Sequence, residues 1–498
     1  MSTDTTAEDP YATLRERIER ITGLEDAAGL LGWDQQVTMP SGGAPARGKQ
    51  LAALSGVTHE LLADDETAAL LAACEETDLT DEQQAVVREL RRRHERAASV
   101  PANLVERHAA RSSDAQQTWQ DAKADSDWAA FAPALDELRT LRVERAGHLA
   151  PDADVYPTLY EENMPTLPLE TVEEIFADLK DALIPLIAEI TERGRDLADP
   201  FDGTYPEEEQ DALNRAVLED LGYPDERGRL DTSAHPFTSG TQFDARITTR
   251  YKQSDPLDGL TATIHEFGHA TYQLGLPDDD YGTPLGSART EVHESQSRFW
   301  ENHIGRTRAF CERLRPQMER HLSDVDGLET DELYEAANRI YPDNQIRVEA
   351  DELTYHMHII LRHELEQEYL DGDLSVEQIP DRWAEKTESY LDVTPEDAAH
   401  GPLQDIHWTT RFGGFPSYTV GSVLAAQLTA AMEADLDVEG CIRDGAFEKL
   451  RAWQTEHVHR HGQRYTADKL VKEATGEPLS ADAFITYAEE KFTDLYGL

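Results

Sequence analysis

Hydrophobic residues recur every three to four positions along most of the chain, a spacing that predicts amphipathic helices. The stretches in which this spacing is clearest are Tyr11–Leu31, Gln50–Leu71, Asp81–Ala98, Leu135–Leu149, Leu169–Leu197, Asn344–Tyr369 and Val420–Leu436. The turn-rich segments between them, such as 39–45, 200–206 and 277–284, are short, and the sequence contains no internal repeat or low-complexity linker. We therefore predict a mainly α fold in which residues 1–498 form a single large helical domain.

One predicted helix carries the motif His265-Glu266-Phe267-Gly268-His269. Asp255 is a suitable N-cap for this helix, and Pro256 fits its first position. The expected apolar stripe consists of Leu257, Leu260, Ile264, Phe267, Thr271 and Leu274. Both histidines point about 150° away from the centre of that stripe, so they should face a cleft. Histidines at positions i and i+4 can bind one metal ion, and the glutamate between them can act on a water molecule as general base.

A third protein ligand is expected downstream, because such a site needs three ligands and an open position. The predicted helix Arg289–Arg308 offers Glu294, which follows His269 by 25 positions. His293 would point about 100° away from Glu294, and we leave open whether it orients a ligand or is structural. The predicted cofactor is one divalent ion per chain held by His265, His269 and Glu294. Zinc is the first choice, and cobalt or manganese would also fit two nitrogens and one oxygen.

The region between Thr232 and Tyr251 differs from the helical pattern. Pro236 and Gly240 interrupt it, and Phe243–Tyr251 alternates in the manner of a strand. We predict a small β-element beside the motif helix, whose edge would be suited to holding an extended peptide by strand addition.

The charge balance narrows the possible partners. The chain has 46 Lys and Arg residues against 99 Asp and Glu residues, which gives a net charge of −53. A protein of this charge is repelled by nucleic acid phosphates and anionic membranes, so we expect neither partner. The acid excess runs along the whole chain, and arginine outnumbers lysine. We interpret this as adaptation to high salt, where the Debye length falls to about 3 Å, rather than as an ordinary acidic protein.

The cysteines and the N-terminus indicate a cytoplasmic protein. Cys74, Cys311 and Cys441 are isolated and odd in number, which argues against disulfides and thiolate metal sites. The segment Met1–Tyr11 lacks the apolar core of a signal peptide, and no later stretch reaches about 18 uncharged apolar residues. We therefore expect neither export nor a membrane span.

Five segments together resemble the carboxypeptidase Taq (M32) family of metallocarboxypeptidases. They are Asp244–Thr248, His265–His269, His293–Gln296, Ile346–Asp351 and Gly401–Trp408, and the run from Gly32 to Pro40 is similar to the family's N-terminal region. The resemblance implies a gluzincin-like fold with a deep active-site cleft, covered by an N-terminal helical part of about 1–230 and completed by a catalytic part of about 231–498. It also implies a homodimer that removes C-terminal residues from peptides with broad specificity.

The resemblance further indicates roles for individual residues. Glu266 would be the general base, and Arg347 and Arg246 are the candidates for binding the substrate's free carboxylate, since a guanidinium matches its two oxygens. Arg347 is expected in the first turn of a helix capped by Asn344, with Asp351 one turn later holding it. His407 and Tyr418 are the candidate donors to the reaction's oxyanion.

Some alternatives remain. In the same region, Trp408 and Phe412 are interpreted mainly as packing residues. The cluster His457, His459 and His461 is interpreted as structural, because no carboxylate follows at ligand spacing. A helical oligoendopeptidase or dipeptidyl carboxypeptidase would share the same metal ligands, and a non-enzymatic helical scaffold is the alternative from another class.

Overall fold

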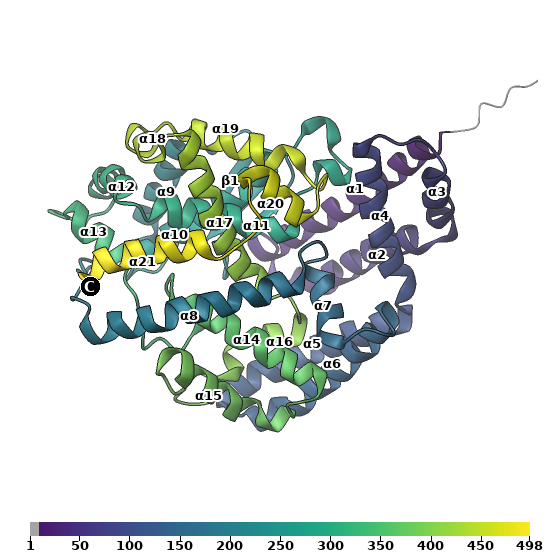
Figure 1. The fold of residues 1–498 in the computed structure, drawn as a ribbon, viewed down its shortest axis with the longest axis horizontal. Helices are drawn as coiled ribbons and strands as arrows, with labels where there is room; N and C mark the ends of the chain where they lie inside the picture. The colour runs from purple at the N-terminus through teal and green to yellow at the C-terminus, as the bar shows by residue number, and fades with distance from the viewer. Residues whose placement is uncertain (1–8) are drawn as a thin grey trace, which may run out of the picture.

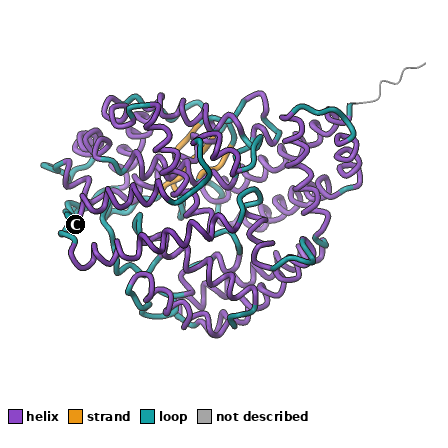
Figure 2. The backbone as a smooth tube through the Cα atoms, in the orientation of Figure 1, coloured by secondary structure: helices purple, strands orange, loops and turns teal. Residues whose placement is uncertain are grey.

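The protein is described here by a computed structural model, which covers residues 9–498. Most of the segment Met1–Tyr11, for which no signal peptide was predicted, lies outside the described residues. Helices dominate this part of the chain, as predicted (Figures 1 and 2). The helices are α1 (Pro10–Val37), α2 (Ala44–Ala63), α3 (Asp65–Glu75), α4 (Asp81–Ser99), α5 (Ala102–Asp125), α6 (Trp128–Leu149), α7 (Val155–Asn163), α8 (Leu169–Arg193), α9 (Glu207–Leu221), α10 (Pro256–Leu274), α11 (Thr290–Arg298), α12 (Arg308–His321), α13 (Thr330–Ala337), α14 (Thr354–Asp371), α15 (Ile379–Leu391), α16 (His407–Thr410), α17 (Pro416–Asp435), α18 (Val438–Asp444), α19 (Phe447–His457), α20 (Ala467–Thr475) and α21 (Asp482–Tyr496).

Most predicted helices form, but the stretch Gln50–Leu71 is two helices rather than one. Asp64 adopts an extended conformation that ends α2, and its side chain accepts a 2.8 Å hydrogen bond from the backbone nitrogen of Thr67 in α3. The apolar residues keep their three-to-four spacing through this break, so the sequence pattern predicted one continuous helix. The aspartate offers the first N–H groups of α3 a local partner, which stabilises a cap in place of a continuous helix.

The predicted β-element is a three-stranded sheet within the described residues. Its strands are β1 (Gly228–Thr232), β2 (Thr238–Gly240) and β3 (Ala245–Thr249), in the order β1-β3-β2. The pairing of β1 with β3 is parallel and that of β2 with β3 is antiparallel. Strand β1 begins before the predicted region. The sheet packs against α10, and the Thr249 hydroxyl donates to the Gly259 carbonyl oxygen at 2.9 Å.

A large cluster of buried apolar side chains extends from Ala115 to Tyr496, and a smaller one joins α1, α3 and α4. In Figure 1 the C-terminal helix α21 runs beside α8, a contact that ties two distant parts of the sequence together. The division of the chain at about residue 230 stays a prediction. Among residues 9–498, none of the helices combines the length and the hydropathy that a membrane-spanning helix needs.

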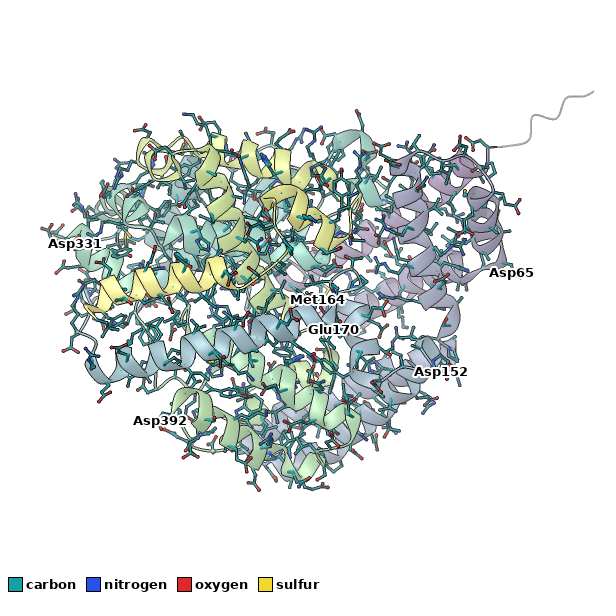
Figure 3. All side chains as sticks on the ribbon, in the orientation of Figure 1. Asp65, Asp152, Met164, Glu170, Asp331 and Asp392 are labelled. Atoms are coloured by element: carbon teal, nitrogen blue, oxygen red, sulfur yellow. The ribbon has the colours of Figure 1, made fainter. Side chains whose placement is uncertain are left out.

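Acidic side chains are exposed at widely separated points of the surface. Asp65, Asp152, Asp331 and Asp392 all lie around the periphery in Figure 3 and are exposed to solvent. The acid excess is therefore spread over many elements, as its distribution in the sequence indicated.

Candidate metal centre

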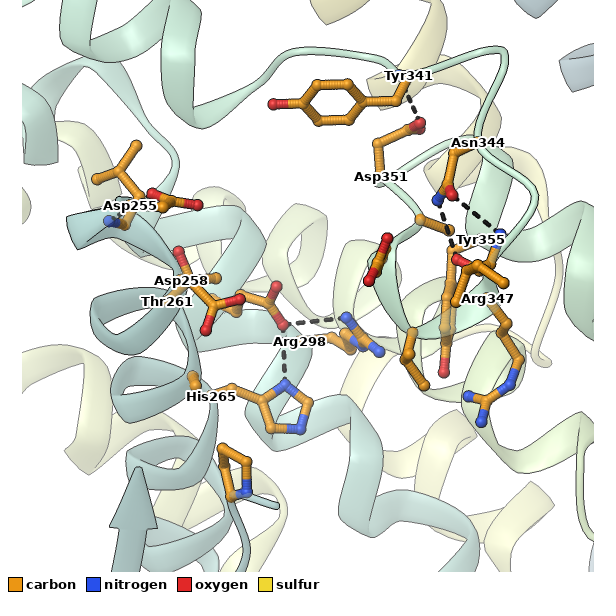
Figure 4. A pocket seen from close by; sticks show the side chains of 18 of the residues that line it. Asp255, Asp258, Thr261, His265, Arg298, Tyr341, Asn344, Arg347, Asp351 and Tyr355 are labelled. Carbon is orange, nitrogen blue, oxygen red and sulfur yellow. Dashed lines mark hydrogen bonds and ion pairs between the residues drawn. The ribbon is translucent and has the colours of Figure 1, made fainter. Parts of the chain in front are cut away.

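Helix α10 presents the two motif histidines to a cleft. The Asp255 side chain accepts a 2.9 Å hydrogen bond from the Leu257 nitrogen, and Pro256 occupies the first position, so the local sequence determines where the helix starts. Leu260, Ile264, Phe267 and Thr271 of the predicted stripe are buried, while Leu257 and Leu274 are partly buried against the core. His265 and His269 on the opposite face line a cleft of ≈ 1190 Å³. Figure 4 shows His265 in this cleft.

Glu294, on α11, lies beside both imidazoles. Its Oε2 atom is 3.4 Å from His269 Nε2 and 3.9 Å from His265 Nε2. Ligand atoms of the three residues all lie within 4.8 Å of one another. Burial opposes ionisation of Glu294, but Arg298 and the two imidazoles outweigh it and lower its pKa to about 2. The structure thus brings together two imidazole nitrogens and one carboxylate, a donor set that suits zinc and neighbouring divalent ions.

The Nδ1 atoms of both imidazoles are already engaged. His265 Nδ1 lies 2.8 Å from Glu301 Oε2, and His269 Nδ1 lies 3.1 Å from the carbonyl oxygen of His293. The His293 ring also contacts His269, with 2.6 Å between their Nδ1 atoms, and burial lowers the His293 pKa to about 3. Hydrogen bonds at Nδ1 orient an imidazole so that Nε2 is left for a metal ion. The site therefore fits such an ion.

Sequence reasoning missed Glu301, although a signal was present. It follows Glu294 by seven positions, which is the spacing of one helix face. The predicted helix Arg289–Arg308 is in fact α11 followed by a π-helix, Phe299–Gly305, so the phase of Glu301 depends on this irregular segment.

Two glycines allow the helices of the site to approach closely. A Cβ atom on Gly268 would lie 2.5 Å from the Cα of Ser297 and 2.8 Å from the carbonyl carbon of Gln296 in α11. A Cβ atom on Gly421 of α17 would lie 2.5 Å from the Cβ of Glu294. All three distances are well below ordinary carbon contacts of about 3.5–4.0 Å. Only glycine permits this spacing of α10, α11 and α17.

Glu266, the predicted general base, is buried and lines the cleft. Its Oε2 atom accepts a 2.6 Å hydrogen bond from the hydroxyl of Thr238 in β2, which also donates to the Glu266 carbonyl oxygen at 2.9 Å. The sequence did not single out Thr238. The small sheet thus holds the glutamate through a side chain, whereas strand addition of a peptide stays a prediction.

Arg347 lies on the cleft wall opposite His265 (Figure 4), but its predicted local structure is wrong. It sits in a 3-10 turn, Arg347–Glu349, and α14 begins only at Thr354. Asp351 does not hold Arg347; its carboxylate caps α14 by accepting from the backbone nitrogens of Leu353 and Thr354, each at 2.9 Å. Asn344 only bonds locally to Ile346. The apolar spacing did not reveal that Asp351 starts a new helix.

The Arg347 guanidinium is held by a different acid, Asp405. Arg347 Nε lies 3.2 Å from Asp405 Oδ2, and the other Asp405 oxygen bonds His407 Nδ1. Burial opposes ionisation of Asp405, but Arg347 and His407 hold its pKa well below its usual value. One buried carboxylate therefore fixes both predicted residues, although only Arg347 reaches the cleft lining and His407 does not.

The other two candidates lie in different surroundings. Tyr418 lines the cleft beside Arg347, and burial raises the pKa of its hydroxyl. Arg246 lies outside the cleft lining; it pairs with Asp244 at 2.6 Å and its guanidinium stacks 4.5 Å from the Trp33 ring of α1.

The residues interpreted as packing are buried or stacked. Trp408 and Phe412 are almost fully inaccessible. His457 stacks on Trp453 with ring centres 4.1 Å apart, and His459 is buried against Gln296. These positions agree with structural roles.

Comparison with known proteins gives matches over nearly the whole chain. The family model described as carboxypeptidase Taq (M32) metallopeptidase matches residues 13–492. Thermostable carboxypeptidase 1 of Thermus thermophilus is 36% identical over 99% of this chain and 100% of its own length. Carboxypeptidase 1 of Bacillus subtilis is 34% identical over 97% of each chain.

Solved structures give the same result for the fold. The M32 carboxypeptidase from Deinococcus radiodurans superposes with a TM-score of 0.93 at 35% identity, over 98% of this chain and 100% of that one. A carboxypeptidase of Pyrococcus furiosus gives 0.94 at 33% identity, with the same coverage.

Proposed function

The chain belongs to the carboxypeptidase Taq (M32) metallopeptidase family and is a metallocarboxypeptidase, and from this premise we propose that it releases single residues from the C-terminus of peptides with broad side-chain tolerance. The observation that supports the proposal is the convergence of His265, His269 and Glu294 beside Glu266, in a cleft that also contains Arg347.

His265, His269 and Glu294 would hold one divalent ion, zinc first and cobalt or manganese as alternatives. Such an ion supplies Lewis-acid chemistry: it lowers the pKa of a water molecule towards about 7 and polarises a carbonyl group. The hydrogen bonds of the two Nδ1 atoms with Glu301 and the His293 carbonyl keep both Nε2 atoms available for this role.

Glu266 takes a proton from the attacking water and passes it to the leaving amine, as a general base and then a general acid. The Thr238 hydroxyl holds one oxygen of Glu266, so the other oxygen is free to face the water. Thr238 is thus a positioning residue for the base.

Arg347 binds the free carboxylate of the substrate, because it is a cation on the cleft wall whose orientation is set by Asp405. Arg246 is a weaker candidate, since Asp244 and Trp33 already occupy its guanidinium. Tyr418 is the better placed of the two oxyanion donors; its raised pKa keeps the hydroxyl protonated, as a donor must be. His407 acts on the cleft only through Asp405.

Peptide ladders test the proposal against its endopeptidase alternatives. One peptide is prepared with a free and with an amidated C-terminus and incubated with the enzyme in high salt, with and without zinc or cobalt. Mass spectrometry should show stepwise loss of single C-terminal residues from the free peptide and almost no cleavage of the amidated one. Equal cleavage of both, or release of internal fragments or dipeptides, would favour an oligoendopeptidase or a dipeptidyl carboxypeptidase.

We extend the proposal to the setting in which the enzyme works. It would be a cytoplasmic homodimer adapted to high salt. The net charge of −53 supports only the salt adaptation, because so many like charges repel one another unless dissolved salt screens them.

A further inference from the structure

Arg298 bridges two carboxylates at the metal centre. It lies one helical turn after Glu294, and its Nε atom is 3.0 Å from Glu294 Oε1. Its Nη1 atom is 3.0 Å from Oε2 of Glu301. The side chain is only 16% exposed, and its guanidinium packs 4.9 Å from the ring of Tyr355, so little freedom remains to it (Figure 4).

Because of the contact with Arg298, the two carboxylate oxygens of Glu294 have different partners. Oε1 accepts from Arg298, whereas Oε2 is the atom that lies 3.4 Å and 3.9 Å from the imidazole Nε2 atoms. A carboxylate held in this way offers one oxygen to an ion and keeps the other occupied. The remaining coordination positions of a bound ion would then be left to water and substrate.

Arg298 also acts on a second ligand, through Glu301. The Oε2 atom of Glu301 accepts from Arg298 and contacts His265 Nδ1 at 2.8 Å, and its Oε1 atom accepts from Arg306 at 2.9 Å. One guanidinium therefore touches Glu294 directly and restrains His265 through one intermediate.

We infer that Arg298 is a positioning residue that preassembles the metal site and makes Glu294 a one-oxygen ligand. The inference rests on the proposed metal site. A planar guanidinium donates to the two carboxylates from separate nitrogens held in a fixed geometry, whereas a lysine ammonium donates all its hydrogen bonds from a single nitrogen and cannot keep both contacts at the same positions. A role that depends on geometry and a role that depends on charge alone therefore predict opposite effects of replacing Arg298 on metal binding. If Arg298 acted by charge alone, lysine would replace it, and a neutral residue would tighten the binding of a dication.

Metal binding in matched variants separates the two roles. The wild type, Arg298→Lys, Arg298→Gln and the control Arg250→Lys are stripped with chelator and titrated with Zn²⁺ against a chromophoric competitor. Arg250 lines the same cleft but pairs with Asp258, which Lys252 also holds. We expect Arg298→Lys and Arg298→Gln each to weaken Zn²⁺ binding about 10–100-fold. The control should stay within about twofold of the wild type, and unfolding temperatures of the metal-free forms report on folding.

The Co²⁺ forms give a readout that a general loss of stability would not produce. The visible absorption bands of cobalt should shift in both Arg298 variants and not in Arg250→Lys, because the ligand geometry changes. Wild-type affinity and spectrum in Arg298→Lys, or tighter binding by Arg298→Gln, would overturn the inference.

A measurement on the wild type alone covers the case in which the variants do not fold. X-ray absorption of the zinc form should show one carboxylate oxygen in the coordination sphere, and two oxygens from Glu294 would refute the role of Arg298. If the wild type binds no stoichiometric ion, the proposed function fails as well. If it binds zinc and cleaves peptides while the Arg298 variants bind normally, only the present inference fails.

Discussion

Replacing Gly421 by alanine should displace the Glu294 carboxylate and weaken metal binding, although Gly421 is not itself a ligand. The added Cβ would lie 2.5 Å from the Cβ of Glu294 and 3.0 Å from its carbonyl carbon. Carbon atoms in contact prefer about 3.5–4.0 Å, so α17 and α11 must separate, or Glu294 must move, by roughly 1 Å. Both responses move Oε2 away from its position near the two imidazoles.

The expected loss of stability is no larger than the expected loss of zinc-binding free energy. Overpacking costs about 1–3 kcal/mol, and replacing a helical glycine by alanine returns up to about 1 kcal/mol. We therefore expect the metal-free protein to lose about 0–2 kcal/mol. A ligand misplaced by about 1 Å should weaken zinc binding 10–100-fold, which corresponds to about 1.4–2.8 kcal/mol.

The assay combines zinc titration of the metal-free protein with urea unfolding of the same samples. Gly23→Ala in α1 is the matched control, because its Cβ would meet nothing within 4 Å. That variant should bind zinc normally and gain about 0.5–1 kcal/mol of stability. Normal zinc affinity in Gly421→Ala would show that the helices absorb the methyl group without moving Glu294, and the close-packing argument would be wrong.

Three further predictions follow from the site and the core. Glu266→Gln should retain stoichiometric zinc and lose about 10²–10⁴-fold in kcat; normal turnover would exclude Glu266 as the base. Thr238→Val should lower kcat about tenfold with zinc content unchanged, and Thr238→Ser should restore most of the rate; an unaffected valine variant would show that the 2.6 Å hydrogen bond is dispensable. Burial lowers the pKa of His363, whose ring bonds the Tyr156 hydroxyl, to about 4. The unfolded chain has a histidine pKa of about 6.5 and therefore binds this proton first, so the His363 contribution is complete above about pH 6.5 and falls by about 1.4 kcal/mol per pH unit down to about pH 4. Urea unfolding of wild type and His363→Gln from pH 7 to 4 at constant salt should show this difference in slope, and parallel curves would contradict it.

The parts of the site that have local causes can be predicted from the amino-acid sequence alone. The start of α10 at Asp255 and Pro256 and the direction of its histidines follow from capping and from the helical period, which act within a few turns. The choice of Glu294 depended on motif spacing and resemblance, and the structure places it beside both imidazoles.

Tertiary packing determines the helix ends and the long-range contacts that the helical spacing of apolar residues does not predict. The spacing of apolar residues does not show where one helix ends and the next begins. Asp64 and Asp351 each cap a new helix within a stretch that the sequence pattern predicted to be one continuous helix. The spacing also cannot say which distant elements meet. Thr238 reaches Glu266 across 28 positions, and Arg246 stacks on Trp33 of α1 rather than facing the cleft.

The orientation of the proposed metal ligands depends on both the local sequence and the tertiary packing. Residues 265, 269 and 294 can be read from the sequence, because each carries a chemistry that few side chains share. Their restraint by Glu301 and Arg298 requires a π-helical turn after α11 and the close packing that Gly268 and Gly421 permit. These distances arise only when α10, α11 and α17 are packed together, since no single helix contains all the atoms that hold the ligands in place.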